Sequence, residues 1–422
     1  MKATMEKAAM TRKPVPRKGE IIPTRPLTFY AGLAPRALTP GSLTAVLNGL
    51  DAGDVAEAMA LFDEMGEKDL HLGAVSQTRA LAVISKDRDV APASSSAGDE
   101  KIAAFVREVF ENLPRKQSLL ASLMSAFSHG FSMAEMIWDV SGGQAVVTEI
   151  APRPQKLFTF VDYEDPARLL DFPNYLDPHN RAGIKLPRDK FIFHKTAHGP
   201  GDVLKSGLYR GIAWYYLFTN YTVKDWLSFM DIYGIPLRLG KYRPTADEQA
   251  RSTLKDAVAN LGSDAAAVIS DDTTIEFIQS AVSGNSALYM DAVEFFNRLK
   301  SKRVLGQTLT TEVSGGSGGA YALGKVHDLV RQDILAFDCK ALDETLTHDF
   351  VRPLVDVNFG PRARYPRVVT RLTRAGESEE KLAQLKTLIE LGAQVPARVA
   401  AEITGVPLIG DMDSPLSPKG GN

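Results

Sequence analysis

The sequence predicts an α+β protein whose second half is dominated by long helices. Short segments that alternate apolar and polar residues, such as "QAVVTEI" and "KFIFHK", predict strands in the first half of the chain. Three later runs with apolar residues at helical spacing each exceed twenty residues. The length of 422 residues, with 44% hydrophobic and 24% charged side chains, fits a globular chain of about two or three domains. We therefore expect a mixed body of helices and strands joined to long helices.

The N-terminal segment, residues 1–40, predicts a flexible basic arm. It carries seven lysines and arginines before Phe29 but no apolar core, so it does not resemble a signal peptide. Its prolines are Pro14, Pro16, Pro23 and Pro26. The body that follows, residues 41–207, has helical spacing over 43–66, 99–113 and 116–130. Its strand-like segments are "FSMAEMIWDV", "QAVVTEI", "KLFTFV" and "KFIFHK".

The run from Leu208 to Tyr233 predicts a helix of roughly 39 Å. Although it contains the apolar stretch "GIAWYYLFTNYTV", that stretch is too short to cross a bilayer, and we expect no membrane contact. A small module, residues 235–284, comes next. It contains a strand "IPLRLGKY", a helix with a capping box from Thr245 to Glu248, and a hairpin made by "AAAVIS" and "TIEFI". A second long helix, residues 285–306, ends before a glycine-rich loop.

A third long helix is expected from Lys325 to Arg352, where Pro353 should end it. Its apolar face consists of Val326, Val330, Ile334, Phe337 and Ala341. The tail predicts a helix over "SEEKLAQLKTLIELG" and a short one after Pro396.

Composition excludes several classes of protein. The formal net charge of −2 excludes a protein that binds nucleic acid over its whole surface, so any contact with DNA must be local or weak. Cys339 is the only cysteine, which excludes an internal disulfide and indicates a reducing setting. We expect its thiol to be a small buried group on a helix rather than a nucleophile.

The segment Gly319-x-x-x-x-Gly324-Lys325 has the spacing of a phosphate-binding loop. A working loop follows a buried strand and places Ser or Thr after the lysine to hold Mg²⁺, whereas Val326 stands there and the preceding "QTLTTEV" is polar. The alternative interpretation is a mobile connection between helices, since residues 315–324 include five glycines. We favour this second interpretation and expect no nucleotide cofactor.

No other pattern predicts catalysis or metal binding. His194, His198 and Asp202 would share one face of a helix, but "KFIFH" predicts a strand and Gly199-Pro200-Gly201 interrupts any helix. Ser128-His129 fits the end of a helix better than a nucleophile with its base. We therefore expect no catalytic residue, no metal site and no cofactor.

A basic cluster follows Gly360, with no acidic residue before its last arginine. It consists of Arg362, Arg364, Arg367, Arg371 and Arg374. Such a run is either a solvated face or a surface for phosphates or an acidic partner.

Several blocks, in order, resemble the portal proteins of Mu-like tailed bacteriophages over about residues 63–407. They are "AFSHGFSMAEMIWDV", "KFIFHK", "GLYRGIAWYYLFTNYTVKDWLSFMDIYGIPLRLGKY", "AAAVISDDTTIEF", "VLGQTLTTE", "VHDLVRQDIL" and "PLVDVNFG". The aromatic-rich block that ends in "YGIP", followed by "LGQTLTTE", is the most specific part of this resemblance.

The resemblance implies a phage portal fold. Residues 41–207 would form an α+β wing, 208–234 and 285–306 two stem helices, and 235–284 a small α/β clip. Residues 307–324 would form a tunnel loop, 325–365 the long wing helix and its return, and 366–422 a short helical crown with a flexible tail.

The same resemblance implies a structural, non-enzymatic protein that forms a ring, twelvefold in its family, at one capsid vertex. The ring would pass double-stranded DNA without sequence preference and would bind the terminase large subunit, the major capsid protein and head-completion or adaptor proteins. It would assemble in the host cytoplasm and remain in the virion. Two alternatives are an ATP-driven nucleic-acid enzyme that uses Gly319 to Lys325, and a head–tail adaptor without a stem.

The loop and its surroundings supply the expected site residues. The DNA-facing residues of the tunnel loop would be Thr308, Thr310, Thr311, Glu312, Ser314, Gly315, Gly316, Ser317, Gly318 and Gly319. At the loop end of the second stem helix, we expect Lys300, Lys302 and Arg303 to line the channel and to add a positive field around the ring.

Overall fold

The computed structural model describes thirteen segments of the chain. They are residues 38–165, 168–177, 180–196, 202–234, 238–242, 245, 247–249, 251–252, 266–270, 286–308, 320–372, 377–391 and 393–404. The N-terminal arm, most of the module at 235–284 and the glycine-rich segment 309–319 therefore lie outside the described residues.

Three helices begin the described chain, namely α1 (Pro40–Asp51), α2 (Ala56–Lys68) and α3 (Leu70–Ile84). Thr39 and Ser42 form a capping box at the start of α1. Asp69 separates α2 from α3, and its carboxylate accepts the Leu72 backbone N–H at 2.9 Å, which caps α3. The corner between these helices is thus fixed by one side chain.

Four further helices belong to the same body, namely α4 (Ala97–Glu111), α5 (Lys116–Met124), α6 (Ala126–His129) and α7 (Val203–Ser206). They pack with α1–α3 around one hydrophobic core that includes Leu43, Phe62 and Phe131. The core extends onto the first half of the long helix α8 (Leu208–Gly234) through Ile212 and Leu217.

The central sheet is antiparallel and has the order β3-β2-β7. Its strands are β2 (Phe131–Asp139), β3 (Val146–Arg153) and β7 (Phe191–Lys195). Glu135 lies fully buried in the middle of β2, where Arg153 donates to it at 2.9 Å and Lys190 lies 3.6 Å away. The two cations compensate a carboxylate that would otherwise be too costly to bury.

Two smaller sheets flank this body. One has the order β4-β5-β6, with β4 (Phe158–Val161), β5 (Leu169–Asp177) and β6 (Asn180–Ile184). The other pairs β1 (Arg88–Ala91) with β10 (Arg367–Thr370), so that it joins two segments almost three hundred residues apart.

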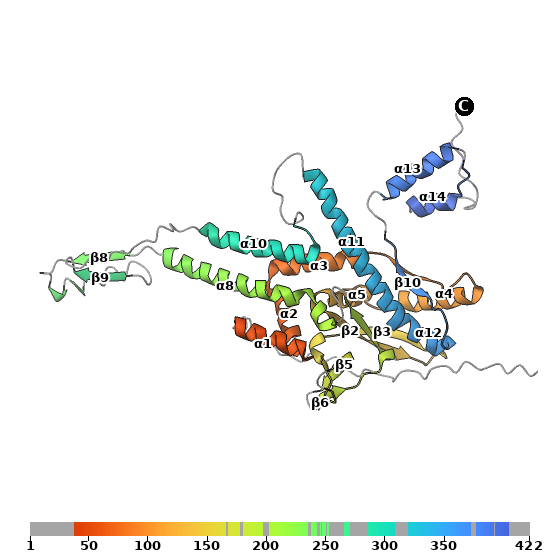
Figure 1. Ribbon diagram of the computed structural model, residues 1–422, viewed down its shortest axis with the longest axis horizontal. Coiled ribbons are helices and arrows are strands. Elements are labelled where there is room, and N and C mark those ends of the chain that lie inside the picture. Colours follow the sequence, from red (N-terminus) through yellow and green to blue (C-terminus); the bar gives the residue numbers. More distant parts are fainter. Residues whose placement is uncertain are drawn as a thin grey trace, which may run out of the picture.

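The two long helices α8 and α10 (Ser286–Leu305) lie side by side and extend away from the sheets (Figure 1). Rings from both helices pack together, with Tyr215 and Phe218 each about 6 Å from Phe296. Beyond their far ends, β8 (Arg238–Tyr242) pairs in parallel with β9 (Ala266–Ser270).

The third long helix, α11 (Ala320–Leu346), continues through a π-helical turn (Thr347–Val351) into α12 (Arg352–Phe359). The expectation that Pro353 ends this helix is wrong. Pro353 instead occupies the first turn of α12, where the missing N–H costs nothing. The wider π turn directly before it absorbs the change in backbone geometry. Gly360, at a positive φ of 80°, ends α12.

The last two helices, α13 (Glu377–Glu390) and α14 (Ala397–Thr404), pack against each other through Leu385 and Ala397. No helix in the described parts of the chain has both the length and the apolar character needed to cross a membrane.

The α+β class and all three long helices are confirmed. The expected helix over 43–66 is two helices, because the chain turns at Gly53, where a side chain would collide with Phe160 and Leu169. "AAAVIS" was expected to pair with "TIEFI"; its observed partner is β8, and "TIEFI" lies outside the described residues. The strands β1, β5, β6 and β10 were not anticipated.

Candidate functional site

The end of α10 is held by a buried polar cluster at the meeting point of three helices. We call it the helix junction and define it by Asp69, Arg79, Lys300, Val304 and Asp338. Arg79 of α3 forms a two-pronged ion pair with Asp338 of α11, at 2.8 and 2.9 Å, and donates to the Val304 carbonyl of α10 at 2.8 Å. The side chains of all five residues are at least nine-tenths buried. The helix immediately before residues 309–319 is therefore anchored to the helix immediately after them.

The structure corrects the expectation for Lys300. Its side chain is 1% exposed, forms an ion pair with Asp69 and donates to the Thr219 hydroxyl at 3.1 Å. Its charge is neutralised inside the subunit, so Lys300 holds α10 against α3 and α8 and does not line a channel. Lys302 and Arg303 lie exposed in the last turn of α10.

The residues named for the loop lie almost entirely outside the described chain. These are Thr310, Thr311, Glu312, Ser314, Gly315, Gly316, Ser317, Gly318 and Gly319. Thr308, the first of the set, is half-buried just after α10.

The structure of this segment differs from that of a phosphate-binding loop. α11 begins at Ala320, so Gly324 and Lys325 already lie inside a helix. A phosphate-binding loop instead keeps these positions in a turn whose backbone N–H groups face the ligand, and its helix begins at the lysine. In this chain, the backbone N–H groups of α11 beyond its first turn donate to carbonyl groups of the same helix.

His194 and Asp202, two of the three residues with metal-ligand spacing, have structural roles. His194 lies buried on β7 and its Nδ1 is 2.9 Å from the Thr345 hydroxyl. Burial lowers its pKa to about 4, so the ring is neutral at pH 7. Asp202 caps α7 by accepting the Leu204 N–H at 2.9 Å, and His198 lies outside the described residues. Within the described residues, no three His, Cys, Asp or Glu side chains are grouped closely enough to hold a metal.

Ser128 and His129 close a helix, as expected. The Ser128 hydroxyl is 2.8 Å from the Ser125 carbonyl and 2.8 Å from His129 Nδ1. The His129 ring is buried between Phe62 and Tyr209. Cys339 is likewise confirmed as a buried residue on a helix, where burial raises the pKa of its thiol to about 11. Such a thiol is not a nucleophile at neutral pH.

The basic cluster is partly neutralised by acidic side chains from β1 and α4. Arg362 lies 3.2 Å from Asp99, and Arg371 lies 3.2 Å from Asp89. Hydrogen bonding from Arg107, assisted by Arg371, lowers the pKa of Asp89. Arg364 and Arg367 are exposed, and Arg374 lies outside the described residues. Of the four arginines that the structure describes, Arg362 and Arg371 are therefore paired, while Arg364, Arg367 and Arg371 are exposed.

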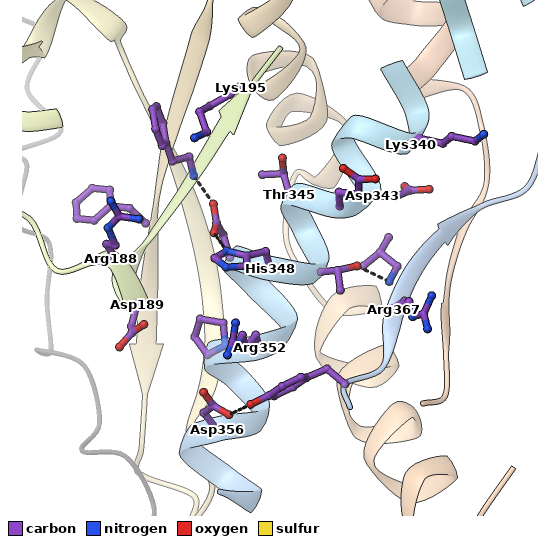
Figure 2. Close-up of a pocket in the computed structure, with 18 of the residues that line it drawn as sticks. Arg188, Asp189, Lys195, Lys340, Asp343, Thr345, His348, Arg352, Asp356 and Arg367 are labelled. Carbon is purple, nitrogen blue, oxygen red and sulfur yellow. Dashed lines mark hydrogen bonds and ion pairs between the residues drawn. The ribbon is translucent and has the colours of Figure 1, made fainter. Parts of the chain in front are cut away.

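A groove of about 900 Å³ lies between β7 and β10, over the π turn that joins α11 to α12 (Figure 2). Lys195 marks the wall formed by β7 and Arg367 the wall formed by β10, while His348 and Arg352 project from the floor. The sequence analysis missed this groove, because its walls come together only through tertiary packing.

The polar groups of the groove are already used to hold the walls. Asp349 accepts the Phe193 N–H of β7 at 2.8 Å, while Asp343 and Thr347 accept N–H groups of β10 at 2.7 and 3.0 Å. These contacts occupy the strand edges, which leaves little reason to expect an added strand there. The groove is lined by five lysines and arginines and by five aspartates and glutamates, so its charges balance and it is not a basic surface.

Apolar side chains are exposed along both long helices. On α8 they are Phe218, Tyr221, Leu227 and Met230, and on α10 they are Leu288, Met290 and Phe295, each at least 40% exposed. Large apolar side chains gathered on a projecting pair of helices indicate a surface that another protein covers.

Comparisons with known proteins agree on one family. The family described as portal protein of Mu bacteriophage matches residues 59–406. The Mu-like prophage FluMu protein gp29 of Haemophilus influenzae is 29% identical over 403 residues, or 93% of this chain and 75% of that protein. The portal protein of Escherichia phage Mu is 31% identical over 345 residues, or 81% of this chain and 65% of that protein.

Solved structures similar to this chain come from gene transfer agent particles. The neck of the native particle, computed with C12 symmetry, matches 88% of this chain and 95% of that chain, with a TM-score of 0.48 and 10% identity. The virion of the native particle matches 88% of this chain and 94% of that chain, with a TM-score of 0.46 and 11% identity.

Proposed function

The chain belongs to the family of portal proteins of Mu bacteriophage, and from this premise we propose that it forms the ring at one capsid vertex through which DNA enters and leaves the head. The observation that carries the proposal is the family match over residues 59–406, which includes the mixed body, both long helices and α11. The protein is then a structural component, and ATP hydrolysis for packaging belongs to a separate motor.

The described elements support an assignment of portal parts. The body at 41–207 is the wing, α8 and α10 are the stem helices, and the module at 235–284 that contains β8 and β9 is the clip. Of the segment 307–324 expected to form the tunnel loop, residues 320–324 belong to α11, so we assign the loop to 307–319. α11 and α12 are the wing helix with its return, and α13 and α14 a short crown.

Exposed apolar residues on both stem helices support a closed ring. Leu227 of α8 is 53% exposed and Leu288 of α10 is 63% exposed, so each helix offers apolar surface to a neighbouring subunit. A head-to-tail ring needs two different complementary faces on each subunit, because each copy contacts one neighbour on either side. We infer twelve copies from the family resemblance.

The charge distribution supports non-specific passage of DNA. Lys302 and Arg303, exposed at the loop end of α10, add two cations per subunit to any ring that the stem encloses. Repetition around the ring strengthens their attraction for phosphate without any contact to bases. The terminase large subunit, the major capsid protein and head-completion proteins are the proposed partners, in the virion and, during assembly, in the host cytoplasm.

Electron cryo-microscopy of the purified full-length protein tests the proposal. We expect a ring with a stem and a central channel about as wide as a DNA duplex, with α10 on the channel side. A head–tail adaptor would give a ring without the paired long helices as a stem. A monomer, or a closed assembly without a channel, would contradict the portal function.

A further inference from the structure

Arg79 connects the two helices that flank residues 309–319. It lies on α3 and donates from Nε and Nη2 to the two carboxylate oxygens of Asp338, in the C-terminal half of α11. Its third nitrogen, Nη1, donates to the Val304 carbonyl in the last turn of α10. The guanidinium also lies over the Phe127 ring, with its central carbon 5.0 Å from the ring centre.

Other contacts hold the last turn of α10 from the same side. The Lys300 ammonium pairs with Asp69, and Ser301 Oγ is 2.7 Å from His71 Nε2, so α3 contacts α10 at three successive levels. Gly306, at a φ of 72°, follows the last turn of α10, and a Cβ there would lie 2.8 Å from Val330 of α11. α10 and α11 are therefore in direct contact at this point, without space for a side chain.

The geometry of Arg79 is one that only an arginine provides. A planar guanidinium satisfies both carboxylate oxygens and a carbonyl at once, whereas a lysine ammonium is a single point of charge on a flexible chain. Arg79 is 6% exposed and Asp338 is 2% exposed, so water cannot replace a lost contact.

We propose that Arg79 is a positioning residue that locks the last turn of α10, directly before the segment 309–319, to the C-terminal half of α11, so that these two parts move together with α3. The consequence for DNA, namely that the lock sets where this segment stands in the channel, rests on the proposed function. The lock itself rests only on the described contacts.

Hydrogen exchange on the purified full-length protein tests the lock through Arg79→Lys. The chain offers a control in Arg153→Lys, since Arg153 also donates from two nitrogens to a buried carboxylate, in this case to Oε2 of Glu135 within the central sheet. We expect Arg79→Lys to speed exchange roughly tenfold or more in peptides covering residues 300–308 and 330–338. Arg153→Lys should speed exchange in β2 and β3 and leave those peptides unchanged. If Arg79→Lys fails to fold, Asp338→Asn, which preserves the shape of the side chain, takes its place and should speed exchange in the same two peptides.

Either of two results would overturn the lock. In one, Arg79→Lys and Arg153→Lys change the exchange rate of both peptides equally. In the other, Arg79→Lys leaves the exchange rate of both peptides unchanged. A second measurement separates the lock from the portal function, namely the fraction of DNA-filled heads in particles complemented with each variant. If only Arg79→Lys lowers the fraction of DNA-filled heads, the result supports both the lock and its link to the DNA path. Faster local exchange with normal filling leaves the lock in place and removes its link to the DNA path.

Discussion

Single residues fix this fold mainly where backbones of distant elements touch. Gly130 ends α6 at a φ of 99°, and a Cβ there would lie 2.5 Å from the Val203 carbonyl at the start of α7. Gly143 also has a positive φ, of 79°, but it lies in an exposed turn, where a Cβ would have no neighbour within 4 Å. The two glycines therefore share a backbone requirement and differ in packing.

Substitution of these glycines should separate the two effects. Gly143→Ala carries only the strain of a positive φ, about 1 kcal/mol. Gly130→Ala adds a collision with the backbone and should cost about 3 kcal/mol or more. Thermal unfolding of the two variants measures the difference, and similar melting temperatures would contradict the close approach at Gly130.

Buried histidine makes stability depend on pH. His194 has a pKa of about 4 in the folded protein, against about 6.5 in an unfolded chain, because burial disfavours the charged ring. The unfolded state binds the proton first on acidification, so the stabilising contribution is complete above pH 6.5 and is lost as the pH falls towards 4. The difference amounts to at most about 3 kcal/mol.

His194→Gln should therefore lose less stability than the wild type between pH 7 and pH 4.5. Melting temperatures at the two pH values measure this loss, with His348→Gln as the control because His348 is 68% exposed. An equal loss in wild type and His194→Gln would show that His194 is not the group that titrates.

Among the elements, the stem helices carry their exposed apolar side chains in rows. On α10, Leu288 and Phe295 are seven residues apart and lie on one face, at 63% and 51% exposure. Other faces of α10 pack against α8 and α3. Since no described element of the same subunit covers this row, we expect it to be buried between subunits.

The double substitution Leu288→Ser and Phe295→Ser should impair ring assembly and leave the melting temperature of the free subunit nearly unchanged. Light scattering coupled to size exclusion gives the assembly state. Tyr163→Ser is the control, because Tyr163 is 52% exposed and follows β4 in the body. Normal assembly of the double variant would place the subunit interface elsewhere.

At the scale of the whole molecule, the chain joins a well-packed body to long helices that extend beyond it. The core takes in the body, the near half of α8, the last turn of α10, and the C-terminal part of α11 with α12. In the sequence, the glycine-rich residues 315–319 lie between α10 and α11.

Deletion of Gly315–Gly319 should leave ring assembly intact and reduce infectious yield at least tenfold, since the shortened loop no longer reaches the DNA. Replacement of the same residues by serine preserves the length and serves as the control. Normal yield from the deletion would refute the role of this loop in packaging or retention of DNA.

The sequence was sufficient where local signals were strong. The long helices were predicted within a few residues because apolar residues recur at helical spacing over more than five turns. Cys339 was correctly predicted to be buried on a helix. The end expected at Pro353 was wrong, since the local rule for proline does not account for a preceding π turn. β1 and β10 were missed because four-residue strands that pair across the whole chain carry almost no local signal.

The candidate site, too, was predicted from the sequence only where local signals were strong. The pattern of glycines and the block "LGQTLTTE" identified the family through resemblance, whereas the loop that they predict lies mostly outside the described residues. They did not distinguish Lys300 from its neighbours Lys302 and Arg303, because charge in a sequence does not report burial. Only the packing of α3 against α10 shows that Lys300 is neutralised by Asp69.

By itself, the sequence determined the helices, the class of fold and the family, because these follow from periodicity and from ordered blocks of residues. Tertiary structure decided which charges reach the surface, which strands pair, and that Arg79 of α3 holds α10 and α11 together. The contacts of Arg79 with Asp338, of Lys300 with Asp69 and of β1 with β10 each join residues more than two hundred positions apart, and no local pattern encodes such a contact.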